Sequence, residues 1–589
     1  MPVTAKKKQN RFDFLYSRCK LRMTAVHSYT DRKNLRLVMR AKINNILKKI
    51  DWKLWAAFLL IFLLYIPAAI LDEIPQRDVA YRYAPAAEAF ARGDWRYAFH
   101  PRMQVLHPAF SGILVSLFSI SGFLAAKLSG LFFYAIGIFP LYKLLQEVFC
   151  KKIAYWGILA YVFASRILLL SYSGLRESHK QLVILLLALG VILVYKYRDR
   201  LKGYLIMGLA SGLAVCTRND MILFTVILFV VCALLEVYRQ IIPWKTILGA
   251  FFSIILSLPE LIVNYKMTGY VIPGARFLSL YEQAFHHLPT LSNVLLVSSV
   301  GFVCSFFIIL PVIGWIIRKE YGRIAFFGIL SLAAFLVCIK IFTGDIQTDK
   351  NYTFANFLEG IYRGQFPFMF FLLLPGLFYR IFRKKMTVPE ILLLSAYLLH
   401  GILIILLILG CDKNLYISSR YLLPATPLFF GWIGITAMLI WKILSRIPVI
   451  VKFRLGISWL AVVMLAAVLY ADAYSSVIKY YRKKKLASVK EQLYTIAGHI
   501  RNDYKGERYW TPKFDLSTYF PNNQPTVWFA DDWKICASGY LSGGSACMYL
   551  KDAKYAVTYA AKPLRRSDFE KMGDPISSKE GTLQIWRRK

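Results

Sequence analysis

Apolar runs of roughly 17 to 25 residues recur between positions 54 and 473, and they constrain the fold more than any other feature. A helix of that length crosses a hydrocarbon layer of about 30 Å. Hydrophobic residues make up 57% of the chain and charged residues only 18%, whereas a soluble domain averages about 25% charged residues. We therefore predict an all-α polytopic membrane protein.

The formal net charge of +40 reflects membrane topology and does not indicate nucleic-acid binding. Lys and Arg residues lie mainly in short loops between the apolar runs, and such loops mark the cytoplasmic side of a membrane. Residues 1–53 hold fifteen of them and no apolar stretch long enough for a cleavable signal peptide. Residues 34–50 place apolar and basic side chains on opposite faces of a helix, which predicts a helix lying on the cytoplasmic leaflet.

The segment 108–121 decides the topology, because it is apolar but too short for an ordinary span. If it crossed the bilayer, the basic loop 196–203 and most later basic loops would lie outside. If it lies in the interface, every basic loop is cytoplasmic, and we adopt this arrangement. It gives about thirteen spans in the inner (plasma) membrane, with the N-terminus inside and the C-terminus outside. The predicted spans are 54–71, 124–146, 153–171, 180–196, 202–216, 221–237, 243–262, 292–316, 324–342, 366–379, 389–410, 421–441 and 456–473.

The loops predicted to be external contain most of the unusual polar residues, and the span centres are almost free of charge. A transporter would place its polar groups near the bilayer midplane. The sequence therefore favours an enzyme that acts at the outer membrane interface over a transporter. Two alternatives stay open: a flippase for a lipid-linked saccharide, and an anchor that presents the C-terminal tail to a partner. Arg166 and Glu260, near the outer ends of spans, are either functional or interfacial residues.

The C-terminal tail, residues 474–589, is long enough for one small external domain. Three short runs with strand-forming residues, "PTVWFA", "KYAVTYA" and "GTLQIW", are separated by Gly, Pro and Asp. They indicate a small α/β or mostly β domain. Cys536 and Cys547 lie in this region, where an oxidising compartment allows a disulfide, and two free thiols are the alternative.

Several motifs follow one another in a characteristic order through the membrane region. They are "DVAYRYAPAAEAFARGDW" from Asp78, "GLRES" from Gly174, "GLASGLAVCTRND" from Gly208, "NYKMTGYVIPG" from Asn264 and "RYLLPATPLFFGW" from Arg420. Their order and spacing resemble the GT-C superfamily of polyprenyl-phosphate-sugar glycosyltransferases. The resemblance is strongest to the glycosyltransferase family 39 type, which includes protein mannosyltransferases and lipid A aminoarabinose transferases. It covers roughly residues 54 to 440.

The resemblance implies a GT-C-like membrane domain over residues 54–473, with a catalytic acid on the first external loop, residues 72–107. It also implies a donor whose lipid tail lies in the bilayer, and transfer with inversion at the anomeric carbon. Asp78 matches the first-loop aspartate of the family, and Glu177 matches the acid after its third span. Arg218 and Asp220 match its "TRPE"-like element.

The chain departs from the family directly after Asp78, where many relatives carry a second acid and this sequence has Val79. Because of this departure, the sequence does not decide whether a divalent metal binds here. Asp78 and Glu73 are its candidate ligands, with Asp72 as a substitute. Asp94 follows Gly93 and is expected to be a turn residue.

Glycosyl transfer from a lipid phosphate needs a base for the acceptor hydroxyl and positive charge for the departing phosphate. We assign the base to Asp78 and a second catalytic role to Glu177. The candidate ligands of the donor and its lipid phosphate are Arg102, His107, Arg218, Asp220, Arg363 and Arg420. The predicted function is therefore that of an inverting glycosyltransferase acting on a lipid, glycan or protein acceptor at the external membrane face.

Each candidate also has a structural alternative. Asp78 precedes a helical run, with Ala84 as an alternative start of the helix, and Asp is a favoured helix N-cap. Glu177 could be a solvated loop residue and His107 a packing residue of a loop. Arg218 could neutralise Asp220, and Arg420 could anchor lipid headgroups.

Overall fold

The structure, a computed structural model, describes part of the chain, and the contacts discussed below lie within residues 57–589. The described residues are 51–71, 78–99, 103–197, 200–218, 221–222, 225, 229, 232, 244–271, 273–275, 367–383, 386–410, 419–444, 446, 495–500, 502–503, 526–529, 545–547, 554–561, 563–564, 566–577 and 582–589. The predicted helix on the cytoplasmic leaflet, residues 34–50, lies outside them.

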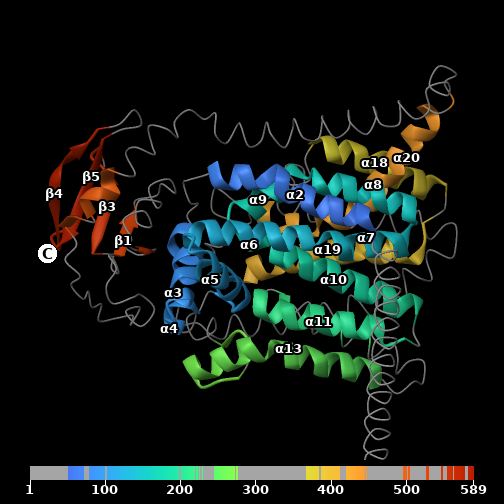
Figure 1. Ribbon diagram of the computed structural model, residues 1–589, viewed down its shortest axis with the longest axis horizontal. Coiled ribbons are helices and arrows are strands. Elements are labelled where there is room, and N and C mark those ends of the chain that lie inside the picture. The colour runs from blue at the N-terminus through green and yellow to red at the C-terminus, as the bar shows by residue number, and fades with distance from the viewer. Residues whose placement is uncertain are drawn as a thin grey trace, which may run out of the picture. The chain divides into compact units, whose positions relative to one another are not determined.

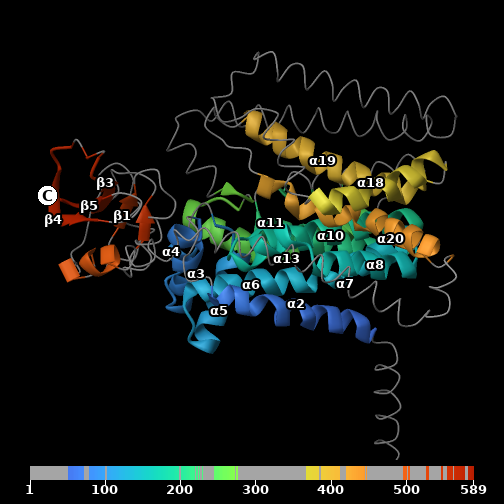
Figure 2. The same ribbon diagram turned by 90° about the horizontal axis from the view of Figure 1, so that it is seen from above.

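The described residues between 52 and 444 are mainly helical (Figure 1). The longer ones are α2 (Trp52–Leu71), α5 (Leu106–Phe118), α6 (Gly122–Ile136), α7 (Ile138–Val148), α8 (Lys151–Val162), α10 (Glu177–Lys196), α11 (Lys202–Thr217), α13 (Trp244–Thr268), α18 (Pro367–Phe382), α19 (Val388–Gly410) and α20 (Phe430–Leu444). Short elements join them: η1 (Val79–Tyr83), α3 (Ala84–Ala91), α4 (Trp95–Ala98), α9 (Ser165–Tyr172), η2 (Ser419–Tyr421) and η3 (Leu423–Phe429). Helices α6, α10, α11 and α13 lie side by side in this order (Figures 1 and 2).

Four stretches of the described helices are long and apolar enough to cross a membrane: Gly122–Val148, Glu177–Lys196, Trp244–Thr268 and Leu423–Ile443. Together with the shorter apolar helices they confirm a helical, multi-pass membrane protein. Several predicted spans, among them 292–316, 324–342 and 456–473, lie outside the described residues, so the number thirteen stays a prediction. Helix α5 has 13 residues and a length of about 20 Å, which is too short for an ordinary span.

The structure corrects some predicted span limits. The span 124–146 consists of α6 and α7, which meet at Gly137. Pro140 in the first turn of α7 has no N–H to continue the hydrogen bonds of α6, so a new helix begins there. The span 153–171 is likewise divided into α8 and α9. The predicted span 180–196 starts too late, because α10 already begins at Glu177.

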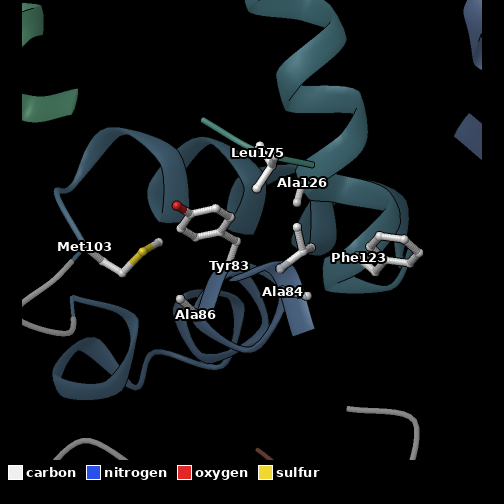
Figure 3. Packing of buried hydrophobic residues seen from close by; sticks show 8 residues of the cluster. Tyr83, Ala84, Ala86, Met103, Phe123, Ala126 and Leu175 are labelled. Atoms are coloured by element: carbon white, nitrogen blue, oxygen red, sulfur yellow. The ribbon is translucent and has the colours of Figure 1, made fainter. Parts of the chain in front are cut away.

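A small apolar cluster fixes part of the loop that follows α2 against the next helices. Val79, Tyr83, Ala84, Ala86, Met103, Phe123, Ala126 and Leu175 pack together in this cluster (Figure 3). Val79 and Leu175 are both almost fully buried. Val79 directly follows Asp78 in the sequence, and Leu175 lies two residues before Glu177. The packing of apolar neighbours therefore positions two acids from distant parts of the chain.

Gly376 provides the close approach between α18 and α20, and its replacement gives the first prediction. A Cβ at this position would fall on the backbone carbonyl oxygen of Trp432, so Gly376→Ala must push the two helices apart. We expect this overpacking to lower the free energy of unfolding by about 1 to 3 kcal/mol. Thermal unfolding in detergent micelles measures the loss.

Gly401 in α19 is a matched control for this substitution. A Cβ there meets only the side chain of Leu422, at the ordinary contact distance of 3.8 Å. Because alanine has the higher helix propensity, we expect Gly401→Ala to be neutral or slightly stabilising. Equal destabilisation by both substitutions would contradict the close approach.

The C-terminal residues form a five-stranded mixed sheet in the order β2-β1-β3-β5-β4. Its strands are β1 (Thr526–Phe529), β2 (Ser545–Cys547), β3 (Tyr555–Tyr559), β4 (Phe569–Ile576) and β5 (Leu583–Arg588). Strand β1 is parallel to β2 and β3, whereas β5 is antiparallel to β3 and β4. The three predicted strands are confirmed as β1, β3 and β5. Cys547 lies in β2 and Cys536 lies outside the described residues, so their disulfide stays a prediction.

Candidate functional site

Asp78 and Arg420 form an ion pair across 342 residues of sequence. Nη1 of Arg420 donates a hydrogen bond to Oδ2 of Asp78 at 2.6 Å. Asp78 precedes the π-helical turn η1, but its side chain makes no capping hydrogen bond there. The helix-cap alternative is therefore wrong, and the next α-helix, α3, begins at Ala84 as predicted.

Glu177 and Arg218 extend this pair into a cluster. The Nε atom of Arg420 lies 3.6 Å from Oε1 of Glu177, and Nη1 of Arg218 lies 3.8 Å from the same oxygen. Glu177 is the first residue of α10, where a carboxylate is favoured by the positive end of the helix dipole. Its residue exposure is only 3%, so the solvated-loop alternative is wrong. The structure thus brings together Asp78, Glu177, Arg218 and Arg420, which sequence reasoning had selected separately.

The charge of Arg420 is maintained by its two carboxylate neighbours. Burial alone would lower the pKa of Arg420, but the carboxylates of Glu177 and Asp78 outweigh this effect and raise the pKa above its ordinary value. The guanidinium therefore stays positive near neutral pH.

Arg176 adds a third guanidinium that sequence reasoning missed. Its Nη1 donates to the side-chain oxygen of Gln104 and lies 3.5 Å from the backbone oxygen of Thr217. Its guanidinium carbon is 5.8 Å from the centre of the Tyr83 ring. Arg176 belongs to the motif "GLRES" and directly precedes Glu177, so this motif could have identified Arg176 as a candidate.

Tyr421 is a second residue that sequence reasoning missed, although it belongs to the motif "RYLLP". The guanidinium carbons of Arg218 and Arg420 lie 5.4 and 5.1 Å from the centre of its ring. An aromatic ring attracts cations over its face. Tyr421 therefore helps to hold the two arginines near each other.

Two consecutive residues, Gln104 and Val105, are held beside this cluster. Arg176 binds the side chain of Gln104, and Oε2 of the buried Glu260 accepts a hydrogen bond from the backbone N–H of Val105 at 3.0 Å. Glu260 comes from α13 and positions this part of the chain, and its functional role stays a prediction.

His107 lies next to the cluster, buried in α5. Its ring centre is 4.9 Å from that of Tyr83 and 5.0 Å from that of His179. Burial, together with the charge of Arg176, lowers the pKa of His107 to about 3. The imidazole is therefore neutral near pH 7, and the role of His107 as a ligand of the donor stays a prediction. Burial likewise raises the pKa of Tyr83, whose phenol stays protonated.

The lowered pKa of His107 gives a second prediction. In the unfolded chain this residue takes up a proton near pH 6.5, whereas in the folded chain it does so only near pH 3. Between these values the unfolded state binds the extra proton, so the free energy of unfolding must fall as the pH falls. We expect a slope of about 1.4 kcal/mol per pH unit from this group.

Thermal unfolding of the wild type and of His107→Gln, measured from pH 7 to pH 4, isolates this contribution from those of other titrating groups. The variant should show the shallower dependence on pH. Equal slopes for the two proteins would contradict a neutral, buried imidazole.

Five further candidates from the sequence lie outside the described residues, and their roles stay predictions. They are Arg102, Asp220, Arg363, Glu73 and Asp72. In the part of the chain that the structure describes, no group of three or more His, Cys, Asp or Glu side chains could hold a metal ion. Asp78 and Glu177, the two acids of the cluster, both face the guanidinium of Arg420. Glu73, the other candidate ligand, lies outside the described residues, so a divalent metal at Asp78 and Glu73 stays a prediction.

Comparison with models of protein families gave no match, and neither did comparison with curated protein sequences. Solved structures do match. The crystal structure of ArnT from Cupriavidus metallidurans bound to undecaprenyl phosphate aligns with a TM-score of 0.53 and 12% identity, covering 91% of this chain and 97% of that chain.

Two structures from Archaeoglobus fulgidus are less similar. The oligosaccharyltransferase in complex with Zn and sulfate has a TM-score of 0.47 and 13% identity, covering 86% of this chain and 68% of that chain. The oligosaccharyltransferase AglB in complex with an inhibitory peptide and a dolichol-phosphate has a TM-score of 0.46 and 12% identity, covering 86% and 69%. The chain therefore shares the fold of the ArnT structure, which is a helical membrane fold.

Proposed function

We propose that this protein transfers a sugar from a polyprenyl-phosphate donor to a lipid, glycan or protein acceptor, with inversion at the anomeric carbon. The observation that carries the proposal is the position of Arg420 between the two acids Asp78 and Glu177, with Arg218 on the same carboxylate. The fold supports it, because ArnT, which shares the fold, was crystallised with undecaprenyl phosphate bound.

Asp78 is the general base in this proposal. The acceptor hydroxyl forms a bond to the anomeric carbon, and its proton passes to the carboxylate of Asp78. The bond between the anomeric carbon and the phosphate oxygen breaks at the same time, and the electron pair leaves with the polyprenyl phosphate. Glu177 does not exchange protons in these steps; it holds Arg420 and Arg218 in place.

The arginines supply the positive charge that the leaving phosphate needs. Arg176, Arg218 and Arg420 outnumber the carboxylates of Asp78 and Glu177, so this group of five carries one excess positive charge. A phosphodiester donor carries one negative charge, and charge builds up on its oxygens as the sugar departs. Arginine suits this task because its planar fork donates two parallel hydrogen bonds to phosphate oxygens.

We place the reaction at the extracytoplasmic face of the plasma membrane. The basic loops support this orientation through the positive-inside rule, with the N-terminus in the cytoplasm and the C-terminal sheet outside. The acceptor then has to reach the first external loop from the outer leaflet or the outer solution.

A reconstituted system tests the proposal and separates it from the flippase alternative. The purified chain is placed in vesicles with a fluorescent polyprenyl-phosphate sugar, and both the release of polyprenyl phosphate and the movement of intact donor across the bilayer are measured. A glycosyltransferase releases polyprenyl phosphate when an acceptor fraction from membranes is added. Rapid movement of intact donor without any release would favour the flippase, and vesicles without protein give the background.

A further inference from the structure

The contact between Asp78 and Arg420 conflicts with the geometry of an inverting reaction. The base and the leaving phosphate lie on opposite sides of the reacting sugar. In inverting glycosidases, which share this requirement, the two catalytic carboxyl groups are about 6.5 to 9.5 Å apart. Asp78 and Arg420 are 2.6 Å apart, which leaves no room for a sugar between the base and the phosphate ligand.

We propose that the donor phosphate displaces Asp78 from Arg420, so that the base becomes available only after the donor has bound. This exchange rests on the proposed function, because it assigns proton transfer to Asp78 and phosphate binding to Arg420. It adds an order to the reaction: donor first, acceptor second. A carboxylate bonded to a guanidinium is also a weaker base than one without such a partner. The ligand-free site therefore holds its base inactive.

The surroundings of Arg420 allow its guanidinium to stay in place while its partner changes. Oε1 of Glu177 remains 3.6 Å from its Nε on the side away from Nη1, and the ring of Tyr421 supports it at 5.1 Å. Nη2 of Arg420 also donates to the hydroxyl of Tyr421 at 3.4 Å. These contacts do not involve Asp78, so they persist when the carboxylate leaves.

An exchange of partners needs only the side chain of Asp78 to move. Its neighbour Val79 is buried in the apolar cluster and keeps the backbone in place. The exchange replaces one charge-assisted hydrogen bond of Arg420 with another to phosphate, so the loss of the first is offset by the second.

Affinity for undecaprenyl phosphate tests the exchange without any turnover, since this lipid carries no sugar. The dissociation constant is measured in nanodiscs for the wild type and for Asp78→Asn. Because the amide competes for Arg420 less strongly than a carboxylate, we expect the variant to bind about tenfold more tightly. A misfolded variant cannot bind more tightly, so tighter binding cannot arise from damage to the fold.

A double-variant comparison separates exchange from simple repulsion between two negative charges. In an Arg420→Gln background, exchange predicts that Asp78→Asn brings no further gain in affinity, whereas repulsion predicts the same gain as in the wild type. The same gain in both backgrounds overturns the exchange, as does unchanged or weaker binding by Asp78→Asn alone. If the wild type does not bind undecaprenyl phosphate at all, the proposed function itself fails.

Discussion

Replacing Asp78 with Asn should lower the rate of sugar transfer by about 10² to 10⁴ while leaving the protein folded. The size follows from the loss of general-base catalysis, which contributes about that factor in other enzymes. Asn has nearly the same shape and its amide oxygen can still accept the hydrogen bond that Arg420 donates to Asp78. It cannot accept the proton of the acceptor hydroxyl. The measurement is kcat at saturating donor in reconstituted vesicles, with the folded fraction determined by size-exclusion chromatography.

Asp94 offers a control in the same loop between α2 and α5. It follows Gly93, whose positive φ of 78° marks a turn, and its backbone N–H bonds to the carbonyl of Ala89. We expect Asp94→Asn to retain the transfer rate to within about twofold, as is usual for substitutions away from a site. Full transfer by Asp78→Asn would remove Asp78 as the base, and an equal loss in both variants would point to a general effect on the loop.

Replacing Arg420 with Gln should remove transfer and also destabilise the protein. Glu177, with 3% of its side chain exposed, would lose the cation on one side, and Asp78 would lose its ion-pair partner. Breaking a buried pair in this way costs about 3 kcal/mol or more. Transfer should fall by at least about 10², because one donor to the departing phosphate is missing.

Two further variants separate the effect of Arg420 on stability from its effect on sugar transfer. Arg420→Lys keeps the charge but not the planar fork, so it should recover part of the stability and little of the transfer. Arg380→Gln breaks another arginine–carboxylate pair, in which Nη2 of Arg380 lies 2.6 Å from Oε2 of the buried Glu390. It should lower the melting temperature while the folded fraction keeps its transfer rate. If Arg420→Gln behaves in the same way as Arg380→Gln, Arg420 is a structural residue only.

The sequence was sufficient to predict the class of fold, because long apolar runs have few alternatives to membrane helices. It was less informative where helices carry polar residues. The polar residues Glu177, Ser178 and His179 have the composition of a loop, yet they begin α10 and are buried. Their burial depends on the helices packed around them, which no local pattern contains. Strand β4 was missed for a similar reason, since "FEKMGDPI" contains Gly, Asp and Pro, which usually indicate turns.

The site was predictable in part, because the motifs select residues one at a time. They identified Asp78 and Arg420 but did not predict that the two are in contact, since the pair is separated by 342 residues. They also gave no role to Arg176, which depends on Gln104 and Thr217 for its position. Charge alone could not distinguish a neutral histidine from a cationic one at position 107, because that distinction requires the burial of the ring.

The long separation between Asp78 and Arg420 in the sequence also has a consequence for the synthesis of the protein. Ribosomes add about 5 to 20 residues per second, so the 342 residues between the two take about 20 to 70 seconds to make. During that time the early helices enter the bilayer with Arg218 already able to bind Glu177, whereas Asp78 still lacks its ion-pair partner. A nascent chain halted before the "RYLLP" motif therefore carries Asp78 without the guanidinium that binds it in the complete protein.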